Sequence, residues 1–118
     1  MKYLLLVYAD LSKRPEYTPE QLQAAQQVNA AYMAELQAAG VSMQHDGFHM
    51  ISGVRTVRIR DGKFLTDDGP FAKTQEQLTG YLMLDCKDLD EAIGWAARNP
   101  AARYGSIEVR PVDAYSRS

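Results

Sequence analysis

Two helices, each with a recognisable start and stop, divide this chain and constrain its fold most strongly. The first is predicted to begin at Thr18-Pro19-Glu20-Gln21, which combines an N-cap hydroxyl, a proline at the first helical position and a capping-box glutamine. Gly40 is expected to end it, because glycine takes the left-handed C′ conformation without strain. Its apolar residues recur at three- and four-residue steps and predict one buried stripe: Leu22, Ala25, Val28, Tyr32, Met33, Leu36 and Ala39.

The second helix is predicted from Asp88 to Asn99. Asp88 is suited to the N-cap, Glu91 stands at the third helical position, and Pro100 stops the helix. Trp95 is expected to cap an interface rather than to stack on a ligand. The predicted apolar face consists of Leu89, Ala92, Ile93, Ala96 and Ala97.

Strands are predicted around these helices. Segments 2–9, 78–86 and 106–110 have strand character, and 41–52 predicts a short strand that leads to a loop at Gly47 or Gly53. Segments 56–60 and 63–66 form a hairpin, since Asp61-Gly62 favours a two-residue turn with positive φ. The order β-α-β, hairpin, β-α-β predicts an α+β, ferredoxin-like domain over residues 1–118, with an antiparallel sheet and a hairpin inserted around 56–66.

The central strands are apolar on both faces. In the first strand Leu4, Leu6 and Tyr8 alternate with other apolar side chains, and the 78–86 strand repeats this pattern. A sheet with helices on one face normally shows polar residues on the other. Burying apolar area is worth roughly 25 cal/mol per Å². We therefore expect a homodimer that pairs sheet to sheet, as a dimeric α/β barrel. The alternative is that the hairpin folds over this face within one chain.

Composition excludes several classes of function. The formal net charge is −2, with basic and acidic residues interspersed, so no nucleic acid partner is expected. The longest apolar run, Leu4 to Val7, is far too short to span a membrane. A single cysteine, Cys86, excludes an internal disulfide and favours a cytoplasmic location. Because Cys86 lies in an apolar run, we expect a buried structural thiol rather than a nucleophile.

The loop after the hairpin carries the most specific motif of the chain. Asp68-Gly69-Pro70-Phe71, within residues 65–81, resembles the signature of the YCII-related, or DGPF, family. Residues 1–8 and the segments 89–92, 95–96, 100–103 and 108–111 resemble this family as well. The resemblance implies a dimeric ferredoxin-like α/β barrel without a settled activity. It also implies a possible link to a sigma factor, because some members are encoded beside extracytoplasmic-function sigma factors.

In the smaller members of that family, a catalytic dyad is proposed. It pairs a histidine on the first helix with an aspartate just before the proline that ends the second. The matching positions here hold Asn29 and Asn99. Neither amide titrates near neutral pH, so the acid–base chemistry of the dyad does not carry over to this chain.

A small molecule is expected to bind in a cleft of the barrel. The candidate binding residues are Tyr8, Asp10, His45, Asp68, Phe71 and Tyr81. Other groups that could meet there are Tyr32, Tyr104, Arg55, Arg58 and Arg103. For Asp68 the alternative is a structural role in the turn, where its side chain would bond local backbone amides. For Phe71 the alternative is a hydrophobic anchor of the loop.

His45 and His49 are four residues apart, so a metal pair is geometrically possible. A third ligand is missing from the pattern, and we expect neither a metal nor another cofactor. Two classes of function stay open. One is a non-catalytic binding or regulatory module; the other is a small-molecule enzyme of the isomerase, dehydratase or oxygenase type, suggested by fold analogy.

Overall fold

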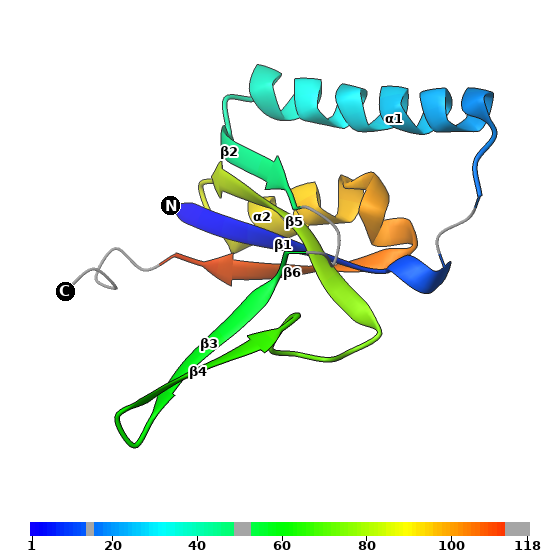
Figure 1. Cartoon of the computed structure of the whole chain (residues 1–118). Coiled ribbons are helices and arrows are strands. Elements are labelled where there is room, and N and C mark those ends of the chain that lie inside the picture. The colour runs from blue at the N-terminus through cyan, green and yellow to red at the C-terminus, as the bar shows by residue number, and fades with distance from the viewer. Residues whose placement is uncertain (14–15, 49–52, 113–118) are drawn as a thin grey trace.

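The computed structural model describes residues 1–13, 16–48 and 53–112. Its strands and helices follow the predicted order (Figure 1). They are β1 (Lys2–Asp10), α1 (Pro19–Ala38), β2 (Ser42–Gly47), β3 (Arg55–Arg60), β4 (Lys63–Asp68), β5 (Glu76–Asp85), α2 (Leu89–Arg98) and β6 (Gly105–Pro111). Two short 3-10 helices, η1 (Leu11–Lys13) and η2 (Pro100–Arg103), follow β1 and α2.

The main sheet has the strand order β2-β5-β1-β6, and each neighbouring pair is antiparallel. The two βαβ units are β1-α1-β2 and β5-α2-β6. In the sheet, β5 lies between β1 and β2, and β1 lies between β5 and β6. This arrangement confirms the predicted α+β class and the antiparallel sheet. Within the described residues, no helix is long and apolar enough to cross a membrane.

The core lies between the two helices and one face of the sheet. Tyr3 and Leu5 of β1 and Leu82 and Leu84 of β5 point into it, together with Leu36 of α1. Cys86, just after β5, is only 2% exposed, which confirms the prediction of a buried thiol. Burial raises the pKa of this thiol, so it stays protonated and unreactive at neutral pH.

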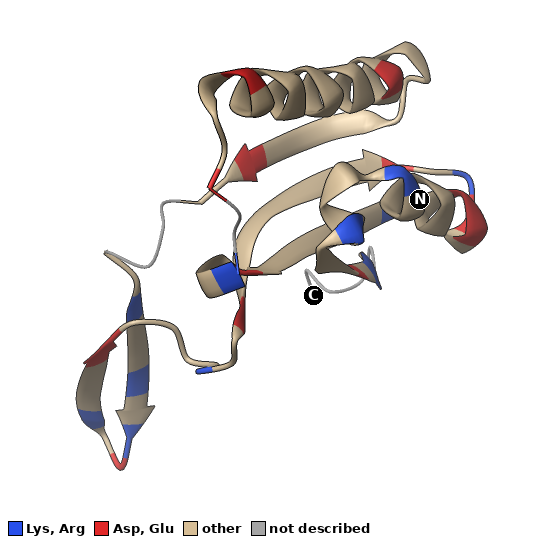
Figure 2. Ribbon diagram, turned by 90° about the vertical axis from the view of Figure 1, so that its right-hand side faces the viewer, with Lys and Arg blue, Asp and Glu red and all other residues tan. Residues whose placement is uncertain are grey.

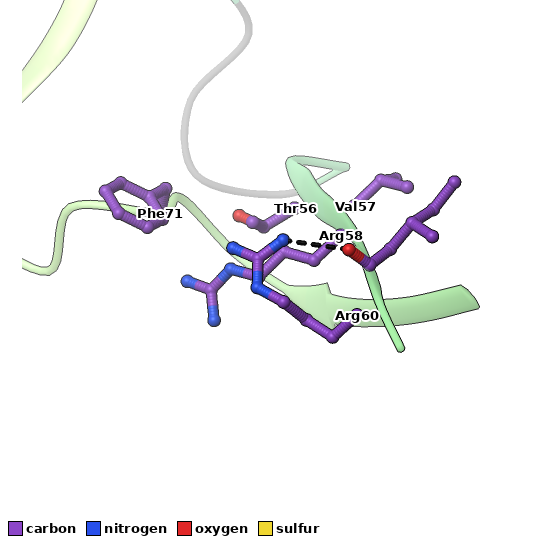
Figure 3. A pocket seen from close by; sticks show the side chains of 6 residues that line it. Thr56, Val57, Arg58, Arg60 and Phe71 are labelled. Carbon is purple, nitrogen blue, oxygen red and sulfur yellow. Dashed lines mark hydrogen bonds between the residues drawn. The ribbon is translucent and has the colours of Figure 1, made fainter. Parts of the chain in front are cut away.

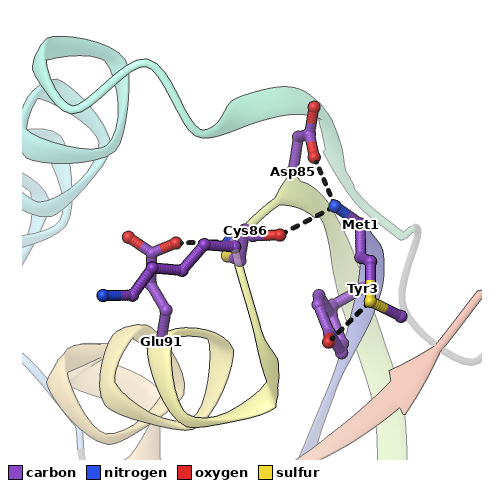
Figure 4. Close-up of polar contacts among 6 residues, drawn as sticks. Met1, Tyr3, Asp85, Cys86 and Glu91 are labelled. Atoms are coloured by element: carbon purple, nitrogen blue, oxygen red, sulfur yellow. Dashed lines mark hydrogen bonds and ion pairs between the residues drawn. The ribbon is translucent and has the colours of Figure 1, made fainter.

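Reciprocal hydrogen bonds fix the start of α2. The Asp88 carboxylate accepts from the Glu91 backbone N–H at 2.9 Å, and the Glu91 carboxylate accepts from the Lys87 N–H at 2.8 Å. Beside them, the Met1 ammonium donates to the Cys86 carbonyl at 2.8 Å (Figure 4). The end of β5, the start of β1 and the first turn of α2 are thereby held together.

Helix α1 begins as predicted, with the Thr18 and Gln21 capping box. However, only its second half packs against the core. Tyr32 is buried, whereas Leu22 and Val28 are 48% and 55% exposed, so the prediction of one buried stripe is wrong for the first half. The first half of α1 lies over a cavity instead of packed side chains, because Ala25 and Val28 line a space of about 440 Å³ that faces η2.

Helix α2 buries Ala92 and Ala96 as predicted, but the rest of its buried face differs from the prediction. Trp95 is 9% exposed, whereas Leu89 and Ile93 are 42% and 48% exposed. The expectation that Trp95 caps an interface is therefore wrong. Its ring packs edge-on against Tyr32 of α1, with ring centroids 6.3 Å apart. This aromatic contact places Trp95 in the core beside Ala92 and Ala96 and leaves Leu89 and Ile93 in solvent.

Strands β3 and β4 form a separate hairpin that projects away from the main sheet (Figure 1). Asp61 and Gly62 have φ of 52° and 75°, as the predicted turn requires. At the base of the hairpin, the Gly69 N–H donates to the Val54 carbonyl at 2.7 Å. The alternative in which the hairpin covers the apolar sheet face of its own chain is therefore wrong.

Candidate binding cleft

Two cavities lie where α1 overhangs the sheet. The inner cavity, of about 320 Å³, is lined by residues that include Val7, Asn29, Met33, His45, Leu82 and Asn99. The outer cavity, of about 440 Å³, is lined by residues that include Tyr17, Val28, Asn29, Arg98, Asn99 and Arg103. Asn29, Asn99 and Ala101 border both. The two cavities are therefore the ends of one cleft between α1, the sheet and the α2–η2 junction.

A hydrogen bond between α1 and α2, which we call the Tyr32–Trp95 joint, fixes the wall of this cleft. The Tyr32 hydroxyl donates a hydrogen bond to the Trp95 carbonyl at 2.8 Å, across 63 positions of sequence. That carbonyl lies in the last turn of α2, where carbonyls lack partners within the helix. Asn29 lies nearly one turn before Tyr32, so the joint determines how far Asn29 stands from η2.

Asn99 is built into the floor of the cleft. It is 6% exposed, and its side-chain oxygen caps η2 by accepting from the Ala101 N–H at 2.9 Å. Burial raises the pKa of Tyr32 to about 12, while a hydrogen bond from the Asn99 amide works in the opposite direction. Asn99 therefore positions the backbone and the Tyr32 hydroxyl.

Asn29 and His45 face the cleft from opposite walls. Asn29 is exposed on α1, and His45 lies opposite Leu82 in the β2–β5 register, on the face of the sheet that the helices cover. The two positions of the family dyad thus do border one cavity, but both carry amides. His45 adds an imidazole, which can donate and accept hydrogen bonds.

Tyr81 also borders the inner cavity. Its hydroxyl donates to the Asp46 carboxylate at 3.4 Å, and its ring lies 5.9 Å from that of Phe48. Desolvation, and then the Asp46 charge, raise the pKa of Tyr81. The phenol therefore serves as a hydrogen-bond donor at neutral pH and not as a base.

The outer cavity is positively charged. Arg98 and Arg103 line it, and no carboxylate does. The Arg98 guanidinium lies 4.5 Å from the centre of the Trp95 ring and pairs with the Glu35 carboxylate. Arg103 makes no ion pair with any residue that the structure describes. A free guanidinium thus stands at one end of the cleft in a chain whose net charge is −2.

Of the six predicted binding residues, His45 and Tyr81 contribute to the lining of the inner cavity, but Tyr81 pairs with Leu6, so its side chain lies on the open face of the sheet and His45 on the covered face. Asp10 lies at another hollow, beside η1, where its carboxylate accepts from the Ser12 hydroxyl at 2.6 Å. This bond lowers the pKa of Asp10. Tyr8 lies in β1, outside the lining of both cavities. Near it in the sheet, the hydrogen bond from Arg110 lowers the pKa of Glu108, and Tyr8 contributes to this shift to a lesser extent.

Asp68 and Phe71 belong to the hairpin and its base, and neither lines the cleft. The Asp68 carboxylate pairs with Arg55 across the hairpin. Phe71 is 71% exposed, and the Arg58 guanidinium lies 4.9 Å from the centre of its ring (Figure 3). Asp68 therefore has a structural role, as an ion-pair partner across the hairpin rather than through the expected bonds to local backbone amides, and the expectation of Phe71 as a hydrophobic anchor is wrong because its ring is exposed.

Of the other groups that could meet in a cleft, Arg103 and Tyr104 do so at the outer cavity. Arg98 was missed, although a basic residue in the last turn of a predicted helix is a usable signal. No group of three His, Cys, Asp or Glu side chains within the described ranges could hold a metal. His49 lies outside these ranges, so the His45–His49 pair stays a prediction.

The sheet with two helices on one face and a polar cleft beneath the first helix define an α+β protein with a small-molecule-sized site. The chain belongs to the YCII-related domain family, which matches residues 1–115 and confirms the resemblance seen in the sequence. An uncharacterized protein of Rhizobium meliloti (strain 1021) is 33% identical over 119 residues, which cover 98% of this chain and 94% of the relative.

A solved structure is similar over nearly the whole length of both chains. It is 5-chloro-2-hydroxyhydroquinone dehydrochlorinase from Burkholderia phenoliruptrix AC1100, in complex with 2,5-dihydroxybenzoquinone. The identity is 15% and the TM-score 0.49, with 99% of this chain and 98% of that chain covered.

Proposed function

We propose that this protein binds a small organic anion in the cleft between α1 and the sheet. The observation that carries this proposal is the charge of the outer cavity, where Arg103, which makes no ion pair with any described residue, faces a space of about 440 Å³ without a carboxylate in its lining. A guanidinium presents parallel N–H donors that match a carboxylate. An anion is therefore the ligand that this end of the cleft favours.

The rest of the cleft suits an apolar body with a neutral polar end. Val28 and Ala25 flank the outer cavity, and Met33 and Leu82 flank the inner one. Apolar walls with a few well-placed polar groups are typical of small-molecule sites. The ligand would place its charge near Arg103 and its far end at the amide of Asn29.

A second copy of the chain is proposed to cover the open face of the sheet. Leu4, Leu6 and Met83 lie on this face and are only half-buried, and the molecule is just 17 Å thick in its shortest dimension. The hairpin of the same chain does not cover them. Pairing of two such sheets would give the dimeric, ferredoxin-like α/β barrel that the family resemblance implies, with residues 1–118 as one domain.

Catalysis is a second candidate function, favoured by the position of His45. Its imidazole could exchange a proton with a bound ligand and lies on the face of the sheet that the helices cover, whereas Asp46 and Tyr81 of the same lining pair with each other on the open face. Replacement of His45 by glutamine should then abolish turnover and leave binding of the anion intact.

The cellular location of the protein and its functional partner are inferred from the sequence. Its single buried cysteine supports a cytoplasmic location. The family resemblance supports a functional link to a sigma factor.

The proposed ligand class is tested by calorimetry with 4-phenylbutanoate and with its uncharged counterpart 4-phenylbutanamide. The carboxylate should bind about tenfold more tightly, as expected for one charge-assisted hydrogen-bonded contact. Arg103→Gln should remove this preference, because it keeps a polar side chain and removes the charge.

Arg60→Gln is the matched control, since Arg60 is exposed at the tip of the hairpin and does not line the cleft. It should leave the preference for the carboxylate unchanged. Equal affinity for the acid and the amide, or equal effects of the two substitutions, would contradict the proposal.

A further inference from the structure

The hairpin carries an exposed apolar row. Val57 and Ile59 of β3 and Phe64 of β4 are 56%, 65% and 68% exposed. Ile59 pairs with Phe64 and Val57 with Thr66, so the three apolar side chains lie on the same face. Figure 3 shows Val57 on the opposite side of β3 from Arg58, which stacks on Phe71. We refer to Val57, Ile59 and Phe64 as the apolar row.

The hairpin is not stable without contacts to another part of a protein. An isolated two-stranded hairpin is marginal in water, and β3 and β4 pack substantially only against each other. The radius of gyration is 16.6 Å, whereas a compact chain of this length would have about 13.5 Å. The arm therefore extends from the body with its apolar row uncovered.

We propose that the apolar row of each hairpin docks on the open sheet face of a second copy of this chain, so that two copies exchange arms. This inference rests on the proposed dimer and goes beyond it, because it names the element that clasps the partner. The docking surface on the partner belongs to the open face that carries Leu4, Leu6 and Met83, and the arm contacts this face where the paired sheet leaves it uncovered.

The dimensions of the arm fit this docking. Its strands have 6 residues each, which is about 20 Å of extended chain. The outermost strands of the main sheet are roughly 14 Å apart. The hairpin leaves after β2 and returns into β5, the strand that carries Met83, so it departs from the sheet that forms the dimer face.

The buried area is of the right size for a stable pair. With side-chain areas of 150–250 Å², the apolar row exposes on the order of 300 Å². Two arms and the surfaces they cover would bury on the order of 1,200 Å², which is the lower end of stable protein interfaces. Contact between the two sheets would add to this area.

The charges of the hairpin favour a protein partner over a nucleic acid. Arg55, Arg58, Arg60 and Lys63 are interspersed with Asp61, Asp67 and Asp68, as Figure 2 shows for the projecting hairpin. This near balance gives little attraction to phosphates. A self-complementary pair of arms is also compatible with the two-fold symmetry of most dimers.

The test is the mass of the full chain in solution, measured by light scattering after size exclusion and by sedimentation at several concentrations. The wild type should be a dimer. Ile59→Ser with Phe64→Ser should weaken the dimer at least about 100-fold, because apolar area is lost in both arms. Leu65→Ser is the matched control, since Leu65 lies on the other face of β4 and should leave the dimer unchanged.

Cross-linking identifies the partner surface directly. A mixture of Phe64→Cys chains and Leu4→Cys chains, treated with a short bismaleimide, should give a cross-linked pair, and Leu65→Cys in place of Phe64→Cys should not. A dimer that survives the double substitution without this cross-link would overturn the exchange of arms and leave the proposed dimer standing. A wild-type monomer would overturn both, and neither result changes the calorimetric test of the cleft.

Discussion

The joint between α1 and α2 offers a stringent test of the structure. Tyr32 is 4% exposed, and its hydroxyl supplies the hydrogen bond that the Trp95 carbonyl cannot obtain within α2. Tyr32→Phe keeps the ring and its edge-on contact with Trp95, and it removes only the donor. Leaving a buried carbonyl unpaired costs about 1–3 kcal/mol, so the variant should be less stable by this amount at pH 7.

The same hydroxyl predicts how stability depends on pH. Burial raises the pKa of Tyr32 from 10.0 to about 12 in the folded state. A group whose pKa is raised on folding contributes fully below its unfolded pKa and loses that contribution as pH rises through the folded pKa. Two pH units correspond to about 2.7 kcal/mol. Between pH 10 and 12 the wild type should therefore lose about this much more stability than Tyr32→Phe.

Urea unfolding at fixed protein concentration measures both effects. Trp95 is the only tryptophan of the chain and reports directly on the joint. Tyr104→Phe serves as the control, because Tyr104 is 66% exposed and should leave the curve unchanged. Equal stability of Tyr32→Phe and wild type at pH 7, or parallel curves between pH 10 and 12, would refute the reasoning.

Thermal unfolding tests two further features. Gly105→Ala should destabilise the fold by about 3 kcal/mol, because a Cβ there would clash with the Tyr8 carbonyl oxygen. Gly94→Ala should stabilise α2 by about 0.5–1 kcal/mol, since a Cβ at that position meets nothing within 4 Å. Asn99→Ala should cost about 1 kcal/mol through the lost cap of η2. Asn99→Asp keeps that acceptor but should also destabilise at pH 7, because its carboxylate cannot donate to Tyr32.

Local chemistry explains which parts of the fold were predictable. The caps at Thr18 and Asp88 and the turn at Asp61 depend on residues within three positions, and each has the predicted form. Alternation along β1 and β5 gave the apolar faces of the sheet. Strand order then followed from two βαβ units, because few antiparallel arrangements accommodate two crossover helices.

Features that depend on distant residues were not predictable. Val28 is exposed because it lines a cavity between α1 and η2, and Trp95 is buried because Tyr32 lies opposite it. The periodicity within each helix predicts neither the exposure of Val28 nor the burial of Trp95. The direction of the hairpin likewise depends on what covers its apolar row, so alternation along β3 could predict the hairpin but not where it points.

The same Tyr32–Trp95 joint that shapes the cleft explains why an amide side chain suits position 99. Because the Tyr32 hydroxyl gives its proton to the Trp95 carbonyl, its oxygen is left as an acceptor. The Asn99 amide can donate to that oxygen while its carbonyl caps η2, and a carboxylate can do only the second. The floor of the cleft is therefore neutral for a structural reason. Charge at this site comes from Arg103, since Arg98 is paired with Glu35, and this charge is the reason for proposing an anionic ligand.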